Sequence, residues 1–361
     1  MRVITVHSTV ARGSGIDSTI ATTLSTIHQL RPEIKLEVIC NETGGFEEDG
    51  FLRDIPVTEV KRRKFRGYSH FSFFPELVGL DVTDDSIVHV HHPTAVLPLF
   101  LKKGKKVFTY HGNNRGCWNH YDFGPFLQRV LRRGIMDTST LLCRSFDKIV
   151  AISDFLRNEL IEAYGFPPQR IERIDWGVDT SLFRPASADE GYMLFVGRHV
   201  GYKSIRTLID LAAEVQFPLV LVGDGKERNA LEQYAKSRDA PVTFKGRVPL
   251  SELVDLYQRC SFYVTASLWE GFGLPPLEAA ACGKPAIVPD NTAHPEITLD
   301  KRTGLVYKDT CELRMVARSL ISSLDQRTDL GSAARARAER NFDVRQTAQA
   351  YVDLYSSLTP C

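Results

Sequence analysis

The chain has 361 residues, more than one ordinary hydrophobic core accommodates, so two domains are expected. Its 45 Lys+Arg and 44 Asp+Glu give a formal net charge of +1, which argues against binding nucleic acid through a broad positive field. Seven widely spaced cysteines without a Cys-x-x-Cys pair argue against a disulfide framework and a thiolate zinc site.

Short apolar runs alternate along the chain with longer segments of helical periodicity. The strand candidates are 3–6, 36–39, 87–90, 107–110, 148–152, 192–196, 218–222, 242–244, 262–265 and 285–288. The helix candidates include 17–29, 154–163, 205–214, 228–237 and 251–259. Several strand candidates are almost continuously apolar, as in parallel strands buried on both faces. The alternation predicts an α/β fold of βαβ units with doubly wound parallel sheets.

The strand–helix alternation restarts after a polar, proline-containing stretch at 180–191, which predicts an interdomain linker. We therefore expect one Rossmann-like domain over 1–180 and a second over 190–341. Ligands of open parallel sheets bind beyond the C-terminal strand ends, so we expect the two domains to face each other across a ligand-binding cleft. The last amphipathic stretch, which begins at Phe342, predicts a helix.

The strongest motif follows the strand candidate 262–265. It consists of Glu270, Gly271, Phe272, Gly273, Leu274, Pro275, Pro276, Leu277 and Glu278. The prolines suit the first turn of a helix, and the glycines let the backbone approach a ligand closely. A helix N-terminus attracts a diphosphate, Glu270 can accept hydrogen bonds from sugar hydroxyls, and Glu278 can accept them from a ribose. The alternative, a plain turn before a surface glutamate, does not explain the complete string.

A second motif follows the strand candidate 192–196, where Gly197-Arg198 and Lys203 place two cations in one loop. Arginine and lysine beside a phosphate form charge-assisted hydrogen bonds. When a nucleoside diphosphate leaves a sugar, charge grows on its β-phosphate, and fixed cations stabilise it. A loop of this kind taken alone is more often a solvated turn, but the 270–278 motif favours the functional interpretation.

Together these motifs resemble the retaining family-4 glycosyltransferases of GT-B fold. The resemblance covers nearly the whole second half and thins toward the N-terminus. It implies that Glu270 contacts the donor sugar, Glu278 the ribose, and Arg198 and Lys203 the diphosphate. Ser204 replaces the glycine that usually follows the lysine. The resemblance also implies that no metal is bound, that a C-terminal helix over 342–361 packs on the first domain, and that the leaving phosphate helps to deprotonate the acceptor.

Two further loops gain a role only through this resemblance. After the strand candidate 242–244, Arg247 and Val248 match positions whose backbone packs on the nucleotide base. Near the N-terminus, Gly15 lies in a glycine-containing loop that resembles the loop closing over the diphosphate. That loop lacks the third glycine and the distant acid of a dinucleotide fingerprint, so a dehydrogenase is not favoured. The Gly223–Gly225 turn is interpreted as a tight strand-to-helix connection.

Histidines cluster in the first half. His111 ends the strand candidate 107–110, where it can hydrogen-bond the donor sugar or the attacking hydroxyl; the alternative is a structural histidine. His89, His91 and His92 lack a carboxylate or further ligand nearby in sequence, so no metal site is predicted, and His91 or His92 is a candidate for the acceptor side. Trp176 stands where the family usually has asparagine.

The stretch 61–74 joins a basic run to an aromatic one. This pattern fits binding to an anionic membrane surface or a lipid phosphate, and it fits a solvated loop equally well. No apolar run approaches the ~20 residues of a membrane-spanning helix, and no signal peptide is recognised. The expected location is therefore the cytoplasm, with contact at the inner face of the membrane.

The sequence predicts a retaining glycosyltransferase that moves a hexosyl residue from a UDP- or GDP-type nucleotide sugar to a glycan or lipid-linked acceptor, without a metal or other cofactor. A phosphorylase or epimerase of the same architecture is the first alternative. A non-catalytic adaptor is the second alternative. Such an adaptor is expected to lack one of the four residues Arg198, Lys203, Glu270 and Glu278, and all four are present.

Overall fold

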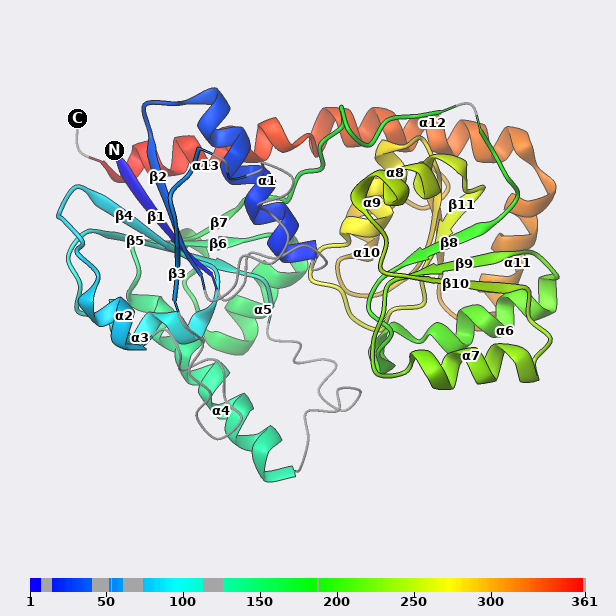
Figure 1. Cartoon of the computed structure of the whole chain (residues 1–361), viewed down its shortest axis with the longest axis horizontal. Helices are drawn as coiled ribbons and strands as arrows, with labels where there is room; N and C mark the ends of the chain where they lie inside the picture. Colours follow the sequence, from blue (N-terminus) through cyan, green and yellow to red (C-terminus); the bar gives the residue numbers. More distant parts are fainter. Residues whose placement is uncertain are drawn as a thin grey trace. The chain divides into compact units, whose positions relative to one another are not determined.

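The computed structural model describes residues 1–7, 15–40, 52, 54–60, 74–112, 126–186 and 188–359. These residues form two compact units (Figure 1): the N-terminal unit, which ends at Gly177 and resumes at Val344, and the C-terminal unit, Val178–Asp343. Each unit is built on one parallel sheet, so the prediction of two Rossmann-like α/β domains is confirmed.

The described residues of the N-terminal unit form a seven-stranded sheet in the order β3-β2-β1-β4-β5-β6-β7, with parallel pairing throughout. The strands are β1 (Arg2–Val6), β2 (Lys35–Cys40), β3 (Val57–Glu59), β4 (Ser86–Val90), β5 (Lys105–Tyr110), β6 (Lys148–Ala151) and β7 (Ile171–Arg173). Because all strands run in one direction, their carboxyl ends form a single edge of the sheet.

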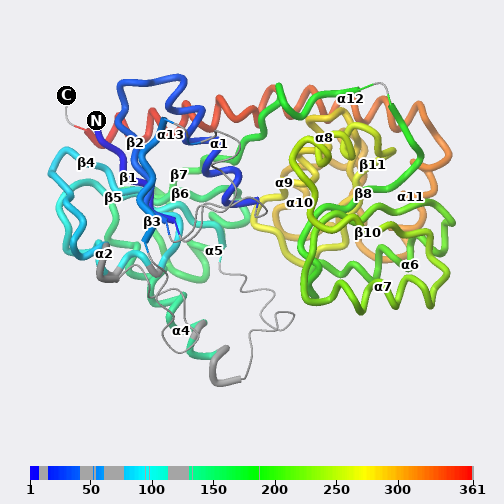
Figure 2. The backbone as a smooth tube through the Cα atoms, in the orientation of Figure 1, coloured from blue at the N-terminus to red at the C-terminus, as the bar shows by residue number. Residues whose placement is uncertain are grey.

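Helices cover both faces of this sheet. They are α1 (Gly15–Leu30), α2 (Phe74–Gly79), α3 (Val96–Leu99), α4 (Phe126–Leu142), α5 (Asp154–Tyr164) and α13 (Val344–Leu358), with 3-10 turns η2 (Pro93–Ala95), η4 (Cys143–Ser145) and η5 (Pro168–Arg170). The C-terminal helix α13 lies beside α1, as the red and blue segments of the trace in Figure 2 show. Both helices bury apolar side chains against the same face of the sheet.

The attachment of α13 requires a glycine. A Cβ at Gly177 would lie 2.5 Å from the Cα of Val344 and 2.7 Å from Oγ1 of Thr347. Thr347 Oγ1 instead donates a hydrogen bond to the carbonyl of Asp175 at 2.9 Å. The first turn of α13 therefore packs directly against the backbone of Asp175 and Gly177, just after the end of β7.

The C-terminal unit contains a six-stranded parallel sheet in the order β10-β9-β8-β11-β12-β13. Its strands are β8 (Met193–Val196), β9 (Leu219–Val222), β10 (Val242–Gly246), β11 (Phe262–Val264), β12 (Ala286–Pro289) and β13 (Gly304–Tyr307). Its helices are α6 (Ile205–Val215), α7 (Arg228–Ser237), α8 (Leu250–Arg259), α9 (Leu274–Ala281), α10 (His294–Ile297), α11 (Thr310–Ser322) and α12 (Leu324–Asn341), with the 3-10 turn η6 (Gly201–Lys203).

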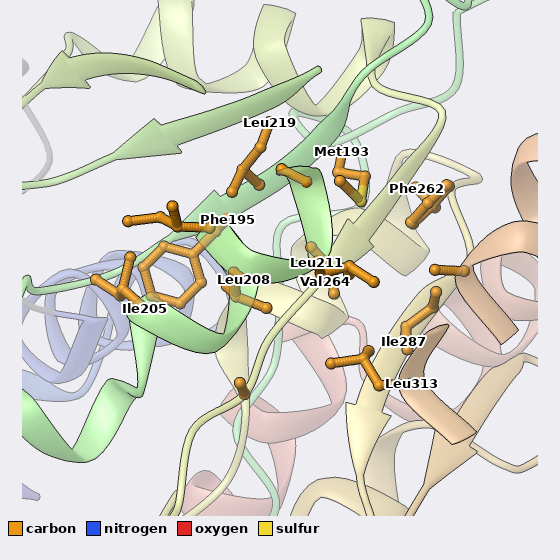
Figure 3. Close-up of a cluster of buried hydrophobic side chains, with 14 of the residues drawn as sticks. Met193, Phe195, Ile205, Leu208, Leu211, Leu219, Phe262, Val264, Ile287 and Leu313 are labelled. Atoms are coloured by element: carbon orange, nitrogen blue, oxygen red, sulfur yellow. The ribbon is translucent and has the colours of Figure 1, made fainter. Parts of the chain in front are cut away.

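Alternate residues of the C-terminal strands point into one closely packed core (Figure 3). Met193, Phe195, Phe262 and Val264 face the helices α6 and α11, from which Leu208, Leu211 and Leu313 contribute. These side chains are at most 2 % exposed. Burying such a side chain contributes roughly 1.5–3 kcal/mol each, so this core holds the strand ends, and the loops that follow them, in fixed positions.

The expected linker at 180–191 lies within the C-terminal unit, not before it. Arg335 donates hydrogen bonds to the carbonyls of Thr180 and Phe183, and Arg327 pairs with Asp189 at 3.0 Å. The chain passes from one unit to the other at Gly177–Val178. The polar composition of 180–191 correctly indicated a surface segment. Hydrogen bonds to the later helix α12, however, fix that segment to the C-terminal unit.

In the described parts of the chain, no helix is both long enough and apolar enough to cross a membrane.

Candidate functional site

Five loops meet at the carboxyl edge of the C-terminal sheet, one after each of β8 to β12. Hydrogen bonds join neighbouring loops: Gly223 N–H to the carbonyl of Gly246 at 2.7 Å, Leu268 N–H to that of Tyr202 at 2.8 Å, and Asn291 Nδ2 to that of Ser267 at 3.2 Å. Carboxyl edges of open parallel sheets are where ligands bind, so these loops define the candidate site of this unit.

Glycine is required where the loops after β8 and β9 touch. Gly223 has a φ of 119°, and a Cβ there would lie 2.1 Å from the carbonyl oxygen of Gly197. A Cβ at Gly225 would lie 2.4 Å from the carbonyl oxygen of His199. The Gly223–Gly225 segment is thus a tight turn packed backbone to backbone, as its sequence indicated.

Lys203 and Glu270 form an ion pair at the centre of this edge, although they are 67 residues apart in sequence. Their side chains are only 9 % and 18 % exposed. The Lys203 ammonium also lies 5.1 Å from the centre of the Tyr202 ring. Ser204 ends the η6 turn in the left-handed conformation (φ 48°), which costs a non-glycine residue about 1 kcal/mol, so the turn keeps its form without the usual glycine.

The ion pair fixes the charge of Glu270. Burial raises the pKa of this carboxyl, but the charge of Lys203, the nearby His294 and hydrogen bonds from Lys203 and Ser267 together bring the pKa below its ordinary value. Glu270 is therefore an ionised hydrogen-bond acceptor at neutral pH. An ionised acceptor beside a cation is suited to bind hydroxyl groups and an adjacent phosphate at once.

Arg198, the other predicted cation, lies on the same loop as Lys203. Its side chain is exposed, and its Nη2 donates a hydrogen bond to the Tyr202 hydroxyl at 3.0 Å. Both cations therefore contact Tyr202, one at its hydroxyl and one over its ring. The structure brings together the two charges that the sequence placed five residues apart.

The glycine-rich motif leads into α9, which begins at Leu274 with a proline in its first turn. Gly273 precedes the helix with a φ of 115°, a conformation that favours glycine. Phe272 is 2 % exposed and meets Phe342 edge to face at 6.0 Å. Gly271 and Gly273 thus lie on either side of the buried Phe272. The packing of Phe272 fixes the direction in which the N-terminus of α9 points.

Glu278 lies one turn inside α9, and its Oε2 accepts a hydrogen bond from the Tyr257 hydroxyl at 2.6 Å. Burial raises the pKa of this carboxyl to about 7, and the hydrogen bond from Tyr257 only partly opposes that effect. Glu278 is therefore a carboxyl whose charge is costly in the unliganded protein and would be stabilised by hydroxyl donors.

We expect Glu278→Gln to stabilise the unliganded protein at alkaline pH. A carboxyl whose folded pKa is raised from 4.5 to about 7 stabilises the fold below pH 4.5, and this contribution is lost as pH rises through 7. Glutamine avoids that loss, so the free energy of unfolding in urea should increase by about 3 kcal/mol at pH 8.5 and remain unchanged at pH 4. Equal stability of both proteins at pH 8.5 would contradict a raised pKa.

The loop after β12 carries residues that sequence analysis missed. Glu270 N–H donates to Thr292 Oγ1 at 3.2 Å, so this loop positions the glutamate backbone. His294 is 1 % exposed, and burial lowers its pKa to about 4, although the charge of Glu270 and a hydrogen bond with the Ser267 backbone oppose this shift. A neutral imidazole beside Glu270 is a hydrogen-bonding group for a ligand. Its position after the strand candidate 285–288 was the available signal.

Arg247 and Val248 follow β10 directly, at the same edge of the sheet. In the N-terminal unit, Gly15 is the first residue of α1, and its carbonyl accepts a hydrogen bond from Thr19 Oγ1 at 2.7 Å. The rest of that loop, residues 8–14, and the stretch 61–73 lie outside the described residues.

His111 follows β5, as predicted, and pairs with His91, which follows β4. His91 Nδ1 and His111 Nε2 are 3.0 Å apart, and the His111 ring lies 5.0 Å from that of Trp176. Burial lowers the pKa of both imidazoles well below the ordinary value, so both are neutral at pH 7. In the described residues, no group of three or more His, Cys, Asp or Glu side chains is arranged to hold a metal ion.

His89 lies within β4, two residues before His91. Its Nδ1 pairs with the Tyr355 hydroxyl of α13 at 2.6 Å, and its Nε2 pairs with Thr109 Oγ1 at 2.7 Å. Both ring nitrogens are therefore occupied, and this histidine ties β4 to β5 and to α13.

Comparison with solved structures defines the class of this fold. The chain superimposes over 99 % of its length on sucrose-phosphate synthase from Thermosynechococcus elongatus (TM-score 0.82, 18 % identity, 99 % of that chain). It superimposes equally on Anabaena HepE in complex with UDP-glucose (TM-score 0.81, 18 % identity, 100 % of that chain). The two parallel-sheet units thus have the GT-B fold.

Sequence relationships identify the family. Residues 21–182 match the model "Glycosyltransferase Family 4", and residues 180–340 match "Glycosyl transferases group 1". An uncharacterized glycosyltransferase of Methanocaldococcus jannaschii is 31 % identical over 297 residues, 79 % of this chain and 80 % of the relative. O-antigen chain mannosyltransferase B of Escherichia coli is 28 % identical over 291 residues, 72 % and 73 % of the two chains. The chain belongs to the family-4 glycosyltransferases, as its motifs predicted.

Proposed function

We propose that this glycosyltransferase moves a hexosyl residue from a nucleoside diphosphate sugar to a hydroxyl of a glycan or lipid-linked acceptor, with retention of the anomeric configuration. The observation that carries the proposal is the buried Lys203–Glu270 pair beside the glycine-rich start of α9. The structure of HepE contains UDP-glucose, and one relative is a mannosyltransferase, which supports a hexose donor.

The diphosphate is the group best matched by the charges of this edge. Arg198 and Lys203 supply two cations around Tyr202, and the N-terminus of α9 adds the positive end of the helix dipole. Charge that develops on the departing β-phosphate is stabilised by such fixed cations, and one donor of this kind contributes about 3 kcal/mol to the transition state. The nucleotide sugar is a substrate, and no metal or other cofactor is part of the proposal.

The remaining residues of the proposed site bind either the sugar or the nucleotide part of the donor. Glu270 accepts hydrogen bonds from the hydroxyls of the donor sugar, and Gly271–Leu274 bind the donor beside it. Glu278 accepts hydrogen bonds from the ribose. The backbone at Arg247 and Val248 supports the base, Gly15 belongs to the loop over the diphosphate, and His111 hydrogen-bonds the sugar or the incoming hydroxyl. No covalent nucleophile is assigned, so retention results from attack on the face that the diphosphate leaves.

Thermal unfolding in the presence of UDP, GDP, ADP and dTDP tests the donor site. A ligand present at 100 times its Kd adds about 2.7 kcal/mol to the free energy of unfolding, so one nucleotide should raise Tm clearly above the others. We expect UDP or GDP to give that shift. If none of the four nucleotides changes Tm at millimolar concentration, the proposed donor class is wrong.

We also propose that the basic and aromatic stretch 61–74 contacts an anionic membrane surface at the cytoplasmic face, near a lipid-linked acceptor. Each basic residue near such a surface contributes about 1 kcal/mol, so replacing Lys61, Arg62, Arg63 and Lys64 by serine should reduce vesicle binding at least 100-fold. Sedimentation with phosphatidylglycerol vesicles measures this, with phosphatidylcholine vesicles as control. The membrane proposal fails if the unaltered protein does not sediment with the anionic vesicles.

A further inference from the structure

Thr292, in the loop after β12, has a backbone conformation that threonine rarely adopts. Its φ is 49°, in the left-handed region, and among the described residues it is the only β-branched residue with a positive φ. The other described non-glycine residues with a positive φ are Ser204, Gln216, Asp239 and Lys301. Strained residues of this kind gather at functional sites. Glycine would form the same turn without strain, so the turn alone does not account for threonine here.

The Thr292 loop binds both backbone groups of Glu270. The Glu270 N–H donates to Thr292 Oγ1 at 3.2 Å, and the N–H of Ala293 donates to the Glu270 carbonyl at 3.4 Å. Two consecutive residues of one loop thus hold the donor and the acceptor of a single residue in the neighbouring loop. Only the bond to Thr292 uses a side chain, so a substitution of Thr292 removes one of the two constraints and leaves the other.

The Thr292 hydroxyl is itself oriented by its neighbour Asn291. Thr292 Oγ1 donates its hydrogen to Asn291 Oδ1 at 3.2 Å, and Asn291 Nδ2 donates to the carbonyl of Ser267 at 3.2 Å. Because the hydroxyl hydrogen is directed at Asn291, a lone pair of Oγ1 is available to the Glu270 N–H. Asn291 and Thr292 therefore attach the loop after β12 to the loop after β11 at two points, Ser267 and Glu270.

These contacts fix the backbone from which the Glu270 carboxylate extends toward Lys203. Ala293 and His294, the residues after Thr292, are 0 % and 1 % exposed, so the supporting loop is itself packed. Two epimers of a hexose differ only in the direction of one hydroxyl. A hydrogen-bond acceptor discriminates between them when its own position is fixed within roughly 0.5 Å. The position of the Glu270 backbone therefore bears directly on the choice of sugar.

We propose that Thr292 is a positioning residue for Glu270 and thereby determines which hexose the enzyme accepts in its nucleotide sugar. The inference rests on the proposed function and deepens it, because the donor sugar is the ligand proposed for Glu270. The left-handed backbone at Thr292 lets Oγ1 and the N–H of Ala293 face the same residue, and the hydroxyl fixes the Glu270 N–H. All of these residues belong to the C-terminal unit.

A role in the turn alone predicts a different response to substitution. Glycine adopts the left-handed conformation freely, so Thr292→Gly would then stabilise the loop and leave the rate unchanged. Alanine lacks the hydroxyl, as glycine does, but remains strained at a positive φ. Serine retains the hydroxyl. These three variants therefore separate the backbone strain from the hydrogen bond to Glu270.

The first test needs no substrate. Thr292→Gly should have a Tm about 2 °C or more above that of Thr292→Ala, since only alanine is strained at this position. Hydrogen-exchange NMR should show the Glu270 amide exchanging about 10-fold faster in both variants and at the unaltered rate in Thr292→Ser. A Tm of Thr292→Gly at or below that of Thr292→Ala would contradict the left-handed backbone. Equal exchange of the Glu270 amide in all four proteins would overturn the inference whatever the activity.

The second test measures nucleoside diphosphate release, with water as the attacking hydroxyl, from pairs of epimeric donors: UDP-glucose with UDP-galactose, and GDP-glucose with GDP-mannose. In Thr292→Ala and Thr292→Gly, kcat for the preferred donor should fall about 10-fold. The ratio of kcat/KM between the two epimers should fall at least fivefold, and the Kd of the free nucleotide should change less than threefold. Thr292→Ser should retain the unaltered rate and ratio.

Asp239→Gly is the matched control. Asp239 is an exposed residue with a φ of 48°, in the turn after α7, so glycine relieves a comparable backbone conformation away from Glu270. This variant should keep the unaltered rate and the unaltered ratio between epimers.

The outcomes separate the inference from the proposed function. If Thr292→Ala keeps both the rate and the ratio, the inference fails and the proposed function stands. A lower rate with an unchanged ratio would overturn the assignment of sugar selectivity to Thr292. If the unaltered protein releases no nucleotide from any of these donors, nor from ADP-glucose or dTDP-glucose, the proposed function fails first and the inference fails with it.

Discussion

Glu270→Gln is expected to slow glycosyl transfer about 100- to 1,000-fold while the Kd of the free nucleoside diphosphate changes less than threefold. The glutamate is proposed to bind the sugar, which the free nucleotide lacks, so only the reacting complex loses an interaction. The expected loss is that of one charged hydrogen-bonding group aimed at the transition state. Rates of nucleotide release and titration calorimetry with the free nucleotide give the two quantities.

The ion pair with Lys203 decides which substitution is informative. Glu270→Ala would leave the ammonium of Lys203, 9 % exposed, without its carboxylate, and breaking a buried pair in this way costs about 3–5 kcal/mol of stability. Glutamine keeps the size of the side chain and a carbonyl that accepts from Lys203. Glu252→Gln, which removes a surface partner of Lys245, is the matched control and should leave the rate unchanged. An unaltered rate in Glu270→Gln would refute its assignment to the donor sugar.

Replacing Arg198 and Lys203 together by alanine is expected to weaken binding of the free nucleoside diphosphate at least 100-fold. Each charge-assisted hydrogen bond to a phosphate contributes about 1.5–3 kcal/mol, so the loss of two exceeds 3 kcal/mol. Titration calorimetry with the nucleotide selected by the thermal-unfolding series measures the change. The corresponding nucleoside, which lacks phosphates, should bind both proteins equally.

Two controls keep that result interpretable. Lys236→Ala with Arg238→Ala removes the same two charges at the exposed end of α7 and should not change affinity. Arg198→Ala alone leaves the Lys203–Glu270 pair intact and should weaken binding roughly 10-fold or more. Unchanged nucleotide affinity in the double variant would mean that these cations do not bind the phosphates.

The sequence predicted the strands that are apolar and buried and missed β3, β7 and β13. β3 and β7 contain three residues each, of which at least two are not buried, whereas the equally short β11 is fully buried and was predicted. The expectation of a helix near Pro275 was accurate because proline and glycine act locally on the backbone. By contrast, the linker at 180–191 was misplaced because its hydrogen bonds to α12 are made with residues far along the chain.

The same distinction applies to the candidate site. Arg198, Lys203, Glu270 and Glu278 could be named from sequence because they stand in recognisable strings. The contacts between them could not, since Lys203 meets Glu270 across 67 residues and Glu278 meets Tyr257 from a neighbouring helix. His294 has no local pattern, and only tertiary structure shows that its side chain is buried.

The most direct test of the central claim is to incubate the protein with nucleotide sugars labelled with ¹³C in the hexose and to follow two products together by NMR and mass spectrometry. The acceptors tried should include mannose-terminated glycans and a lipid-linked sugar. We predict that one donor yields free nucleoside diphosphate and an equal amount of a glycoside that carries one labelled hexose with the anomeric configuration of the donor. Formation of nucleotide and glycoside should both be lost in Glu270→Gln. An inverted glycoside would contradict the proposed retention, and no turnover of any nucleotide sugar with any acceptor or with water would contradict the account as a whole.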